Sequence, residues 1–186
     1  MVTIRALRTR ARILDAALDL FERQGYDATT VNEIAEAAGI TPMTFFRHFP
    51  TKDAVLVTDP YDPLIAEAIG TQPVDLAPLE RTRRGLLAAL GDISALEDAT
   101  AKRRVALVAE SPALRAAAAV GTEATQQAIV ERLVSDGAER LDATVAAAVC
   151  LAAATAALLA WGTAPDDTTL AGLVRHALTQ LAPDPS

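Results

Sequence analysis

The stretch "GITPMTFFRHFPTK", residues 39–52, holds side chains whose types suit contact with a nucleic acid. Threonine hydroxyls can bond to several base atoms, and proline and methionine offer apolar contact to a thymine methyl group. Arginine, histidine and lysine donate to phosphate oxygens. The candidates for such contacts are Thr41, Pro42, Met43, Thr44, Phe46, Arg47, His48 and Lys52.

Two short helices joined by a tight turn are predicted to position these side chains. Thr30 can cap a helix that carries Glu33 three residues later, which is the spacing of a capping box, and Gly39 ends that helix. Thr41 can cap the next helix, with Pro42 at its first position. A preceding helix over 8–24 repeats apolar residues at helical spacing and closes at Gly25, so the pattern predicts a helix-turn-helix supported by a third helix.

The charge of the chain is unevenly distributed. The net charge is −7, yet the residues up to 55 hold seven basic and seven acidic side chains, and the rest hold ten basic and seventeen acidic ones. Because binding to a polyanion depends on the local face presented, an acidic body attached to a neutral module is compatible with DNA binding. We therefore expect an affinity for DNA that falls steeply with salt.

Composition predicts an all-α protein. Alanine is abundant, aromatic residues make up only 4% and no run of alternating β-branched residues is found. The single cysteine, Cys150, excludes an internal disulfide and is expected to be a buried small apolar residue of a cytoplasmic protein. The N-terminus lacks the pattern of a signal peptide, and the uncharged segment 143–165 is interpreted as a buried helix of a soluble protein rather than a membrane span.

The remainder of the chain is predicted to form a helical bundle. A short helix begins at Lys52 and stops before Pro60, and helical patterns then cover 63–70, 77–91, 98–110, 113–136, 141–161 and 168–181. The predicted division is a helix-turn-helix DNA-binding domain over 1–54 and a helical ligand-binding and dimerisation domain over 55–186.

Residues 8–56 resemble the DNA-binding domain of the TetR family of bacterial transcriptional regulators. The resemblance lies in the order and spacing of "FERQGY", "TTVNEIA", "AAGIT" and "FFRHFPTK". It implies a homodimeric regulator, usually a repressor, that binds a palindromic operator in double-stranded DNA and is released by a small effector. No cofactor and no metal are implied.

The resemblance also implies roles for single residues. Thr41, Pro42, Met43 and Thr44 would lie nearest the bases, although Thr41 and Pro42 also simply begin a helix. Arg47 and His48 fall at positions that face DNA, and Thr30 and Lys52 lie at helix starts suited to phosphate. Phe46 stands where the family usually has a tyrosine that bonds to a phosphate, so that contact is expected to be lost or reduced to packing.

In the body, the family pattern places dimerisation on the last two long helices, and segment 141–161 suits this because its alanines allow close approach of backbones. The alternative is that this segment is only the centre of one subunit's core. The sequence suggests an apolar effector, and the candidates for its pocket are Leu87, Leu90, Arg104, Val108, Val120 and Trp161. These residues suit a plain core equally well.

The alternatives to a ligand-responsive repressor are an enzyme, another kind of DNA-binding protein and a protein-interaction module. An enzyme is not supported, because the sequence has no Gly-rich phosphate loop, no nucleophile elbow and no metal-ligand constellation. A helix-turn-helix activator, or an architectural DNA-binding protein without an effector, remains an alternative. A third possibility, a protein-interaction module that has lost DNA binding, is suggested only by Phe46.

Overall fold

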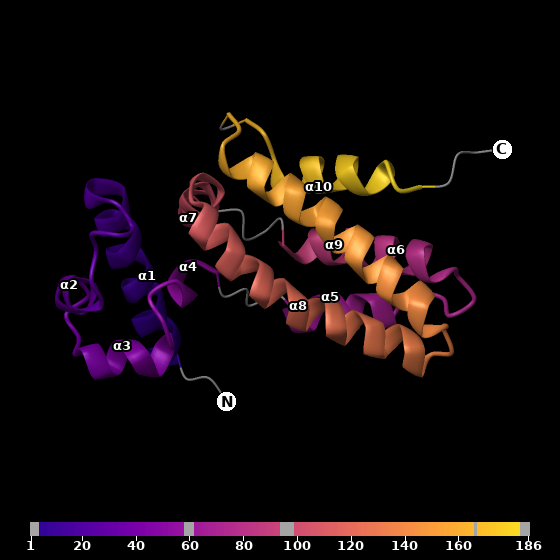
Figure 1. Ribbon diagram of the computed structural model, residues 1–186, viewed down its shortest axis with the longest axis horizontal. Helices are drawn as coiled ribbons and strands as arrows, with labels where there is room; N and C mark the ends of the chain where they lie inside the picture. The colour runs from indigo at the N-terminus through magenta and orange to yellow at the C-terminus, as the bar shows by residue number, and fades with distance from the viewer. Residues whose placement is uncertain (1–3, 58–61, 94–98, 166, 183–186) are drawn as a thin grey trace.

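The structure is a computed structural model that describes residues 4–57, 62–93, 99–165 and 167–182 (Figure 1). Within these ranges the chain forms ten helices and no strand. Their bounds are α1 Ile4–Gln24, α2 Val31–Ala37, α3 Pro42–His48, α4 Ala54–Val57, α5 Asp62–Gly70, α6 Pro78–Ile93, α7 Ala99–Glu110, α8 Pro112–Ser135, α9 Arg140–Gly162 and α10 Leu170–Thr179. Figure 1 shows α1–α4 at one end of the molecule and the longer helices packed around α9 at the other.

The first three helices form one unit around the buried side of α1. Ile13, Ala17 and Phe21 recur at intervals of four residues and are almost fully buried, and they meet Ile34 of α2 and Phe45 of α3. A stripe of this width on one helix is stable only when other helices cover it. The predicted helix-turn-helix is therefore confirmed, and α1 begins four residues earlier than the sequence indicated.

As predicted, N-cap residues begin α2 and α3, and glycines follow the ends of α1 and α2. Thr30 and Glu33 form a complete capping box at α2, and the Thr41 hydroxyl accepts a hydrogen bond from the Thr44 amide at α3. Gly25 and Gly39 have φ of 87° and 62°, a region in which a Cβ is strained. The turns before α2 and α3 are thus locally encoded.

The body is organised around α9, which packs against α6, α7, α8 and α10. Its inner face carries Ala143, Ala146 and Ala147, whose small side chains let the neighbouring helices approach. At two glycines the approach is tighter still. A Cβ on Gly85 of α6 would lie 2.4 Å from a carbon of Ile69 in α5, and one on Gly162 would lie 2.7 Å from Val105 of α7.

Among the described residues, an ion pair between α6 and the end of α8 has a buried arginine and a partly exposed carboxylate. The side chain of Arg81 in α6 is 3% exposed, and its Nη2 donates to Oδ2 of Asp136, the C-cap of α8, at 2.6 Å. Arg132 donates to the same oxygen at 2.9 Å. Hydrogen bonds from both arginines, Arg81 first, lower the pKa of Asp136 below its ordinary value. This pair joins α6 to the end of α8.

The DNA-binding unit and the body share a core rather than meeting through a linker. Val55 and Leu56 of α4 are buried in the same cluster as Phe21 of α1 and Val108 of α7. Across the surface of this junction, Arg103 of α7 binds Asp19 and Glu22 of α1 at 2.6 and 2.7 Å. The helix expected from Lys52 begins at Ala54 instead, and Pro60, where a stop was predicted, lies outside the described residues.

Among the described residues, α9 is the one helix that is long and apolar enough to cross a membrane. Its inner face is covered by the body, while Leu141, Val145 and Val149 lie on an exposed face. Cys150, on the inner face, is fully buried as predicted, and burial raises the pKa of its thiol to about 11.

Candidate nucleic-acid interface and effector cavity

The outer face of α3 presents the predicted DNA-contacting side chains to solvent. Met43 is 82% exposed and Phe46 is 52% exposed, and Pro42 and Arg47 are exposed as well. Phe45 and Phe49 point the other way, into the core, and are at most 2% exposed. The seven-residue helix therefore separates a packing face from a free face, as a helix that enters a groove must.

Thr41 and Thr44 are linked to each other at the start of this helix. Their hydroxyl oxygens lie 3.0 Å apart, in addition to the cap made by Thr41. A threonine hydroxyl keeps acceptor capacity after donating one bond. Thr41 thus begins the helix, and both hydroxyls stay at its exposed N-terminal end.

His48, in the last turn of α3, is surrounded by positive charge. Burial lowers the pKa of its imidazole first, followed by the charges of Arg47 and Arg10. At neutral pH the ring is therefore mostly uncharged, and it serves as a hydrogen-bonding group beside the permanent charge of Arg47.

Lys52 makes contacts within the protein that the sequence did not predict. Its ammonium donates to the carbonyl oxygens of Tyr26 and Thr29 at 2.7 and 2.9 Å and lies 4.1 Å from the centre of the Tyr26 ring. It thereby ties the start of α4 to the turn before α2. One of its three N–H donors is left for a phosphate.

Thr30 also has a structural role. Its hydroxyl donates to Oε2 of Glu33, and the same carboxylate accepts from the Thr30 amide, both at 2.8 Å. These bonds lower the pKa of Glu33. Thr30 is exposed, so this N-cap residue is accessible to solvent at the start of α2.

Two arginines of α1 bind backbone carbonyls at the ends of the other two helices. Arg10 Nη1 donates to the His48 carbonyl oxygen at 3.0 Å, and its guanidinium lies 4.1 Å from the centre of the Phe49 ring. Arg12 donates to the carbonyl of Ala38 at the end of α2. The C-terminal ends of α2 and α3 carry partial negative charge, so these contacts also stabilise the helix dipoles.

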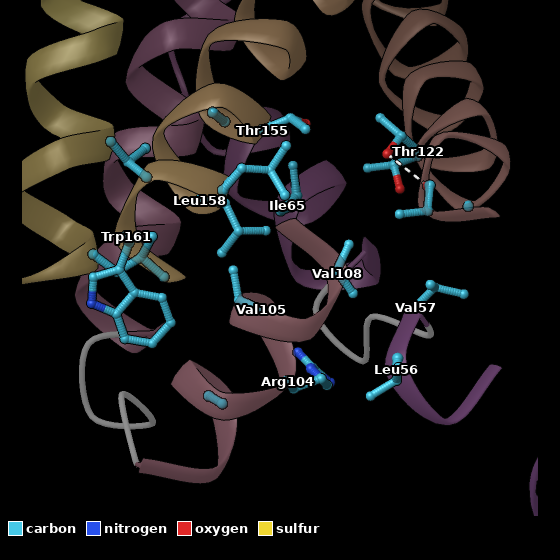
Figure 2. Close-up of a pocket in the computed structure, with 18 of the residues that line it drawn as sticks. Leu56, Val57, Ile65, Arg104, Val105, Val108, Thr122, Thr155, Leu158 and Trp161 are labelled. Atoms are coloured by element: carbon cyan, nitrogen blue, oxygen red, sulfur yellow. Dashed lines mark hydrogen bonds between the residues drawn. The ribbon is translucent and has the colours of Figure 1, made fainter. Parts of the chain in front are cut away.

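A cavity of about 750 Å³ lies between the DNA-binding unit and the body. It is lined by α1, α4 and helices of the body, and Figure 2 shows Trp161 and Leu158 of α9 on one side and Leu56 and Val57 of α4 on the other. Most of the lining is aliphatic, with threonines such as Thr122 and Thr155 among it. A volume of this size is typical of pockets for small organic ligands.

Four of the six predicted pocket residues line this cavity and two do not. Leu90, Arg104, Val108 and Trp161 lie in its wall. Leu87 is outside it, because Leu86 and Leu90, one helical turn apart, occupy the face of α6 that points inward. Val120 is 71% exposed, because the neighbouring Gly121 and Thr122 take the inward face of α8.

The sequence did not indicate that α1 contributes to the cavity. Leu7, Arg10, Ala11 and Leu14 line it. Leu7 and Ala11 are exposed and are spaced four residues apart, on a side of α1 other than the packed stripe. The sequence feature that could have indicated this contribution is a second apolar face on α1. The indication is weak because alanine and leucine are common on any helix.

Two family models match the chain and together cover most of it. Residues 13–57 match the model described as "Bacterial regulatory proteins, tetR family", and residues 65–185 match "MftR C-terminal domain". The first match contains α2, α3 and α4, and the second contains most of the body.

Relatives and solved structures agree with these matches. The "HTH-type transcriptional regulator TcmR" of Streptomyces glaucescens is 35% identical over 116 residues, which is 59% of this chain and 51% of that protein. The chain thus spans about half the length of that relative. A Thermus thermophilus FadR, solved in complex with lauroyl-CoA, is 26% identical with a TM-score of 0.50, covering 95% of this chain and 99% of that one. The SmeT–triclosan complex, from Stenotrophomonas maltophilia, has a TM-score of 0.61 at 22% identity, covering 93% and 89%.

Proposed function

Because the chain belongs to the TetR family of transcriptional regulators, we propose that it is a cytoplasmic, homodimeric repressor whose affinity for a palindromic operator is lowered by a small effector. The observation that carries the proposal is the free outer face of α3, which sits on a packed three-helix unit directly beside a cavity of ligand size.

The proposed DNA contacts follow from the exposure of each side chain. Thr44, Met43 and the helix start at Thr41 and Pro42 meet base edges in the major groove. Arg47 and His48 hold phosphates, with Thr30 and the remaining donor of Lys52 at the flanks. Phe46 packs against the sugar-phosphate backbone, since it has no hydroxyl to donate.

The proposed dimer contact is the outer face of α9. Leu141, Val145, Val149 and Ala152 follow one another at intervals of three or four residues and are all exposed. An exposed apolar stripe of this length is typical of a surface that another protein covers. In a dimer with two-fold symmetry the same stripe serves both subunits.

The proposed effector site is the cavity between α1, α4 and the body. The solved relatives with lauroyl-CoA and triclosan show that proteins of similar fold hold small apolar or partly apolar molecules. Here a ligand would touch the DNA-binding unit and the body at once. It lowers operator affinity if it binds the non-DNA-binding arrangement of the dimer more tightly.

Selection from a random pool of DNA duplexes by the purified protein, at two salt concentrations, tests the proposal. A symmetric sequence with half-sites about one helical turn apart is the expected result. It supplies the operator for effector screening. If no sequence is enriched, or if binding disappears uniformly with salt, an architectural or protein-interaction role replaces the repressor. Operator binding that no effector alters favours a regulator without a ligand.

A further inference from the structure

The cavity contains two positive charges and no negative one among the residues that the structure describes. Of the residues in its wall, Arg10 of α1 and Arg104 of α7 are the ionisable ones, and both are only partly exposed. The other polar side-chain groups in the wall are threonine hydroxyls and the indole N–H of Trp161, which donates to the Thr168 carbonyl. Ionised side chains in an apolar cavity are costly unless they are paired.

Neither arginine has a carboxylate partner in the described part of the chain. Arg10 is held by the His48 carbonyl and the Phe49 ring, both neutral groups. Arg104 forms no ion pair and no hydrogen bond there, in contrast to the adjacent Arg103, which binds two carboxylates. Both arginines lie in the wall of the same cavity, and burial and then the charge of Arg104 lower the pKa of Arg10.

These charges suit an anionic head group on an otherwise apolar ligand. Guanidinium groups bind carboxylate and phosphate oxygens through paired, charge-assisted hydrogen bonds. Beyond Arg104 the wall is apolar through Val105, Val108 and Leu158 to Trp161, as Figure 2 shows. The cavity therefore offers one charged end and a long apolar body.

We propose that the effector is an amphipathic anion whose carboxylate or phosphate oxygens bind Arg10 and Arg104, with its apolar part directed toward Trp161. Arg10 then links the ligand to the DNA-reading helix, because the same guanidinium binds the carbonyl of His48 at the end of α3. An anion that binds this guanidinium competes with the His48 carbonyl for its N–H donors, and so weakens the contact that holds the end of α3. The inference rests on the proposed effector role of the cavity and gives that effector its chemical class.

The test compares ligands that share one chain and differ in the head. Dodecanoate, dodecyl phosphate, dodecanol and dodecylamine are titrated into the full chain below their micelle concentrations, without DNA. Trp161 is the only tryptophan and lies in the cavity wall, so its fluorescence reports binding. We expect one anion per subunit to bind at least tenfold more tightly than the alcohol and the amine. The relative affinity of the carboxylate and the phosphate identifies the head group.

Variants of Arg104 assign the charge preference to this site. Arg104→Gln should weaken anion binding at least tenfold and leave dodecanol unchanged, and Arg104→Lys should restore part of the loss. The control is Arg84→Gln, which changes an exposed arginine of α6 that pairs with Glu80 and lies outside the cavity wall, and this variant should bind like the parent chain. Thermal unfolding followed by circular dichroism verifies that each variant is folded.

The outcomes separate this inference from the proposed function. Equal binding of the anions and dodecanol, or an Arg104→Gln variant that keeps full preference for anions, overturns the inference while operator binding stands. Failure to select an operator overturns the repressor but leaves the measured preference of the cavity intact. Loss of operator affinity with dodecanoate in the parent chain, absent in Arg104→Gln, supports both.

Discussion

At the scale of single residues, contacts within the DNA-binding unit decide which charges are left for DNA. The outward residues Met43, Phe46 and Arg47 keep their side chains exposed. Arg10, Arg12 and Lys52 instead bind backbone carbonyls that end or connect the helices. A cation that already holds the fold contributes less to phosphate binding than its charge suggests, since its donors are shared.

The first prediction concerns the pH dependence of operator binding through His48. The free protein keeps the pKa of His48 below 6.5, whereas a phosphate oxygen beside the ring favours the imidazolium and raises the pKa in the complex. Binding then takes up a proton, so affinity should rise as the pH falls from 7 to 5.5, by up to about tenfold per pKa unit gained.

Fluorescence anisotropy of a labelled operator over this pH range measures the effect. The His48→Gln variant should show a flatter profile, because its amide does not titrate. An identical slope in the parent chain and the variant would place His48 away from the phosphate.

Sequence reasoning at this scale succeeded where the deciding interaction is local. The caps at Thr30 and Thr41 depend on residues three positions away, and both were confirmed. The partners of Lys52 lie 23 and 26 residues away, and the carbonyls that Arg10 and Arg12 bind are set by how three helices pack. No spacing in the sequence encodes those contacts.

At the scale of helices, the predicted ranges in the body agree with the structure within about two residues at each end. Proline and glycine breaks and apolar periodicity determine these ends, and both are visible in the sequence. The faces were harder to predict. Leu87 and Val120 sit one position away from lining residues. In α6 the adjacent Leu86 and Leu87 suit an inward face equally well, and in α8 the run of alanines before Val120 leaves the inward direction ambiguous.

The second prediction concerns the close approach of α5 and α6. Gly85→Ala places a methyl group 2.4 Å from a side-chain carbon of Ile69 and 2.6 Å from its Cα, so the helices must separate. We expect a loss of about 1–3 kcal/mol in the free energy of unfolding, as for other overpacked cores.

The matched control is Gly121→Ala in α8, where the nearest atom to the new methyl is 3.8 Å away. Alanine favours a helix over glycine by about 1 kcal/mol, so this variant should be more stable than the parent. Urea denaturation measures both. A Gly85→Ala variant as stable as Gly121→Ala would contradict the tight packing at Gly85.

The third prediction concerns the ion pair between the buried Arg81 of α6 and Asp136 at the end of α8. Asp136→Asn leaves the guanidinium of Arg81, 3% exposed, without a counter-charge, and a buried charge that loses its partner is strongly unfavourable. Arg132→Gln removes the more exposed partner and should cost less than about 1 kcal/mol.

Chemical denaturation of the two variants and of the double variant Arg81→Leu/Asp136→Asn distinguishes the charge from the packing. The double variant should recover part of the loss, because no unpaired ion remains. Equal effects of Asp136→Asn and Arg132→Gln would show that Arg81 does not depend on this carboxylate.

At the scale of the whole molecule, the acidic body and the neutral reading unit have separate electrostatic roles. In the proposed function, operator binding depends on the face around α3, and the surplus of acidic residues lies after residue 55. Two copies of that face must be held at a fixed separation to read a palindrome. The arrangement therefore depends on the pairing of the bodies.

The fourth prediction concerns this pairing. Val145→Glu places a charge on the outer stripe of α9, where the side chain is 51% exposed in one subunit. Burial of an unpaired charge in a dimer contact is strongly unfavourable, so the variant should be a folded monomer with much weaker operator affinity.

Sedimentation velocity gives the mass of the particle against 19.5 kDa for one chain. Val74→Glu is the control, because Val74 is 67% exposed and lies in the connection between α5 and α6, outside α9. A Val145→Glu protein that stays dimeric would exclude this face of α9 as the contact.

The ion pairs of Arg103 with Asp19 and Glu22 matter when the DNA-binding unit of one such regulator is joined to the body of another. Exchanging residues 1–54 for the reading unit of another regulator deletes both carboxylates and leaves Arg103 beside whatever surface replaces them. It also replaces Arg10, and with it one wall of the cavity. A chimera built at this boundary inherits the cavity, and with it the proposed ligand site, incompletely. Transplanting the ligand response to a new operator therefore requires substitutions on the outer face of α3, made within the parent's own α1.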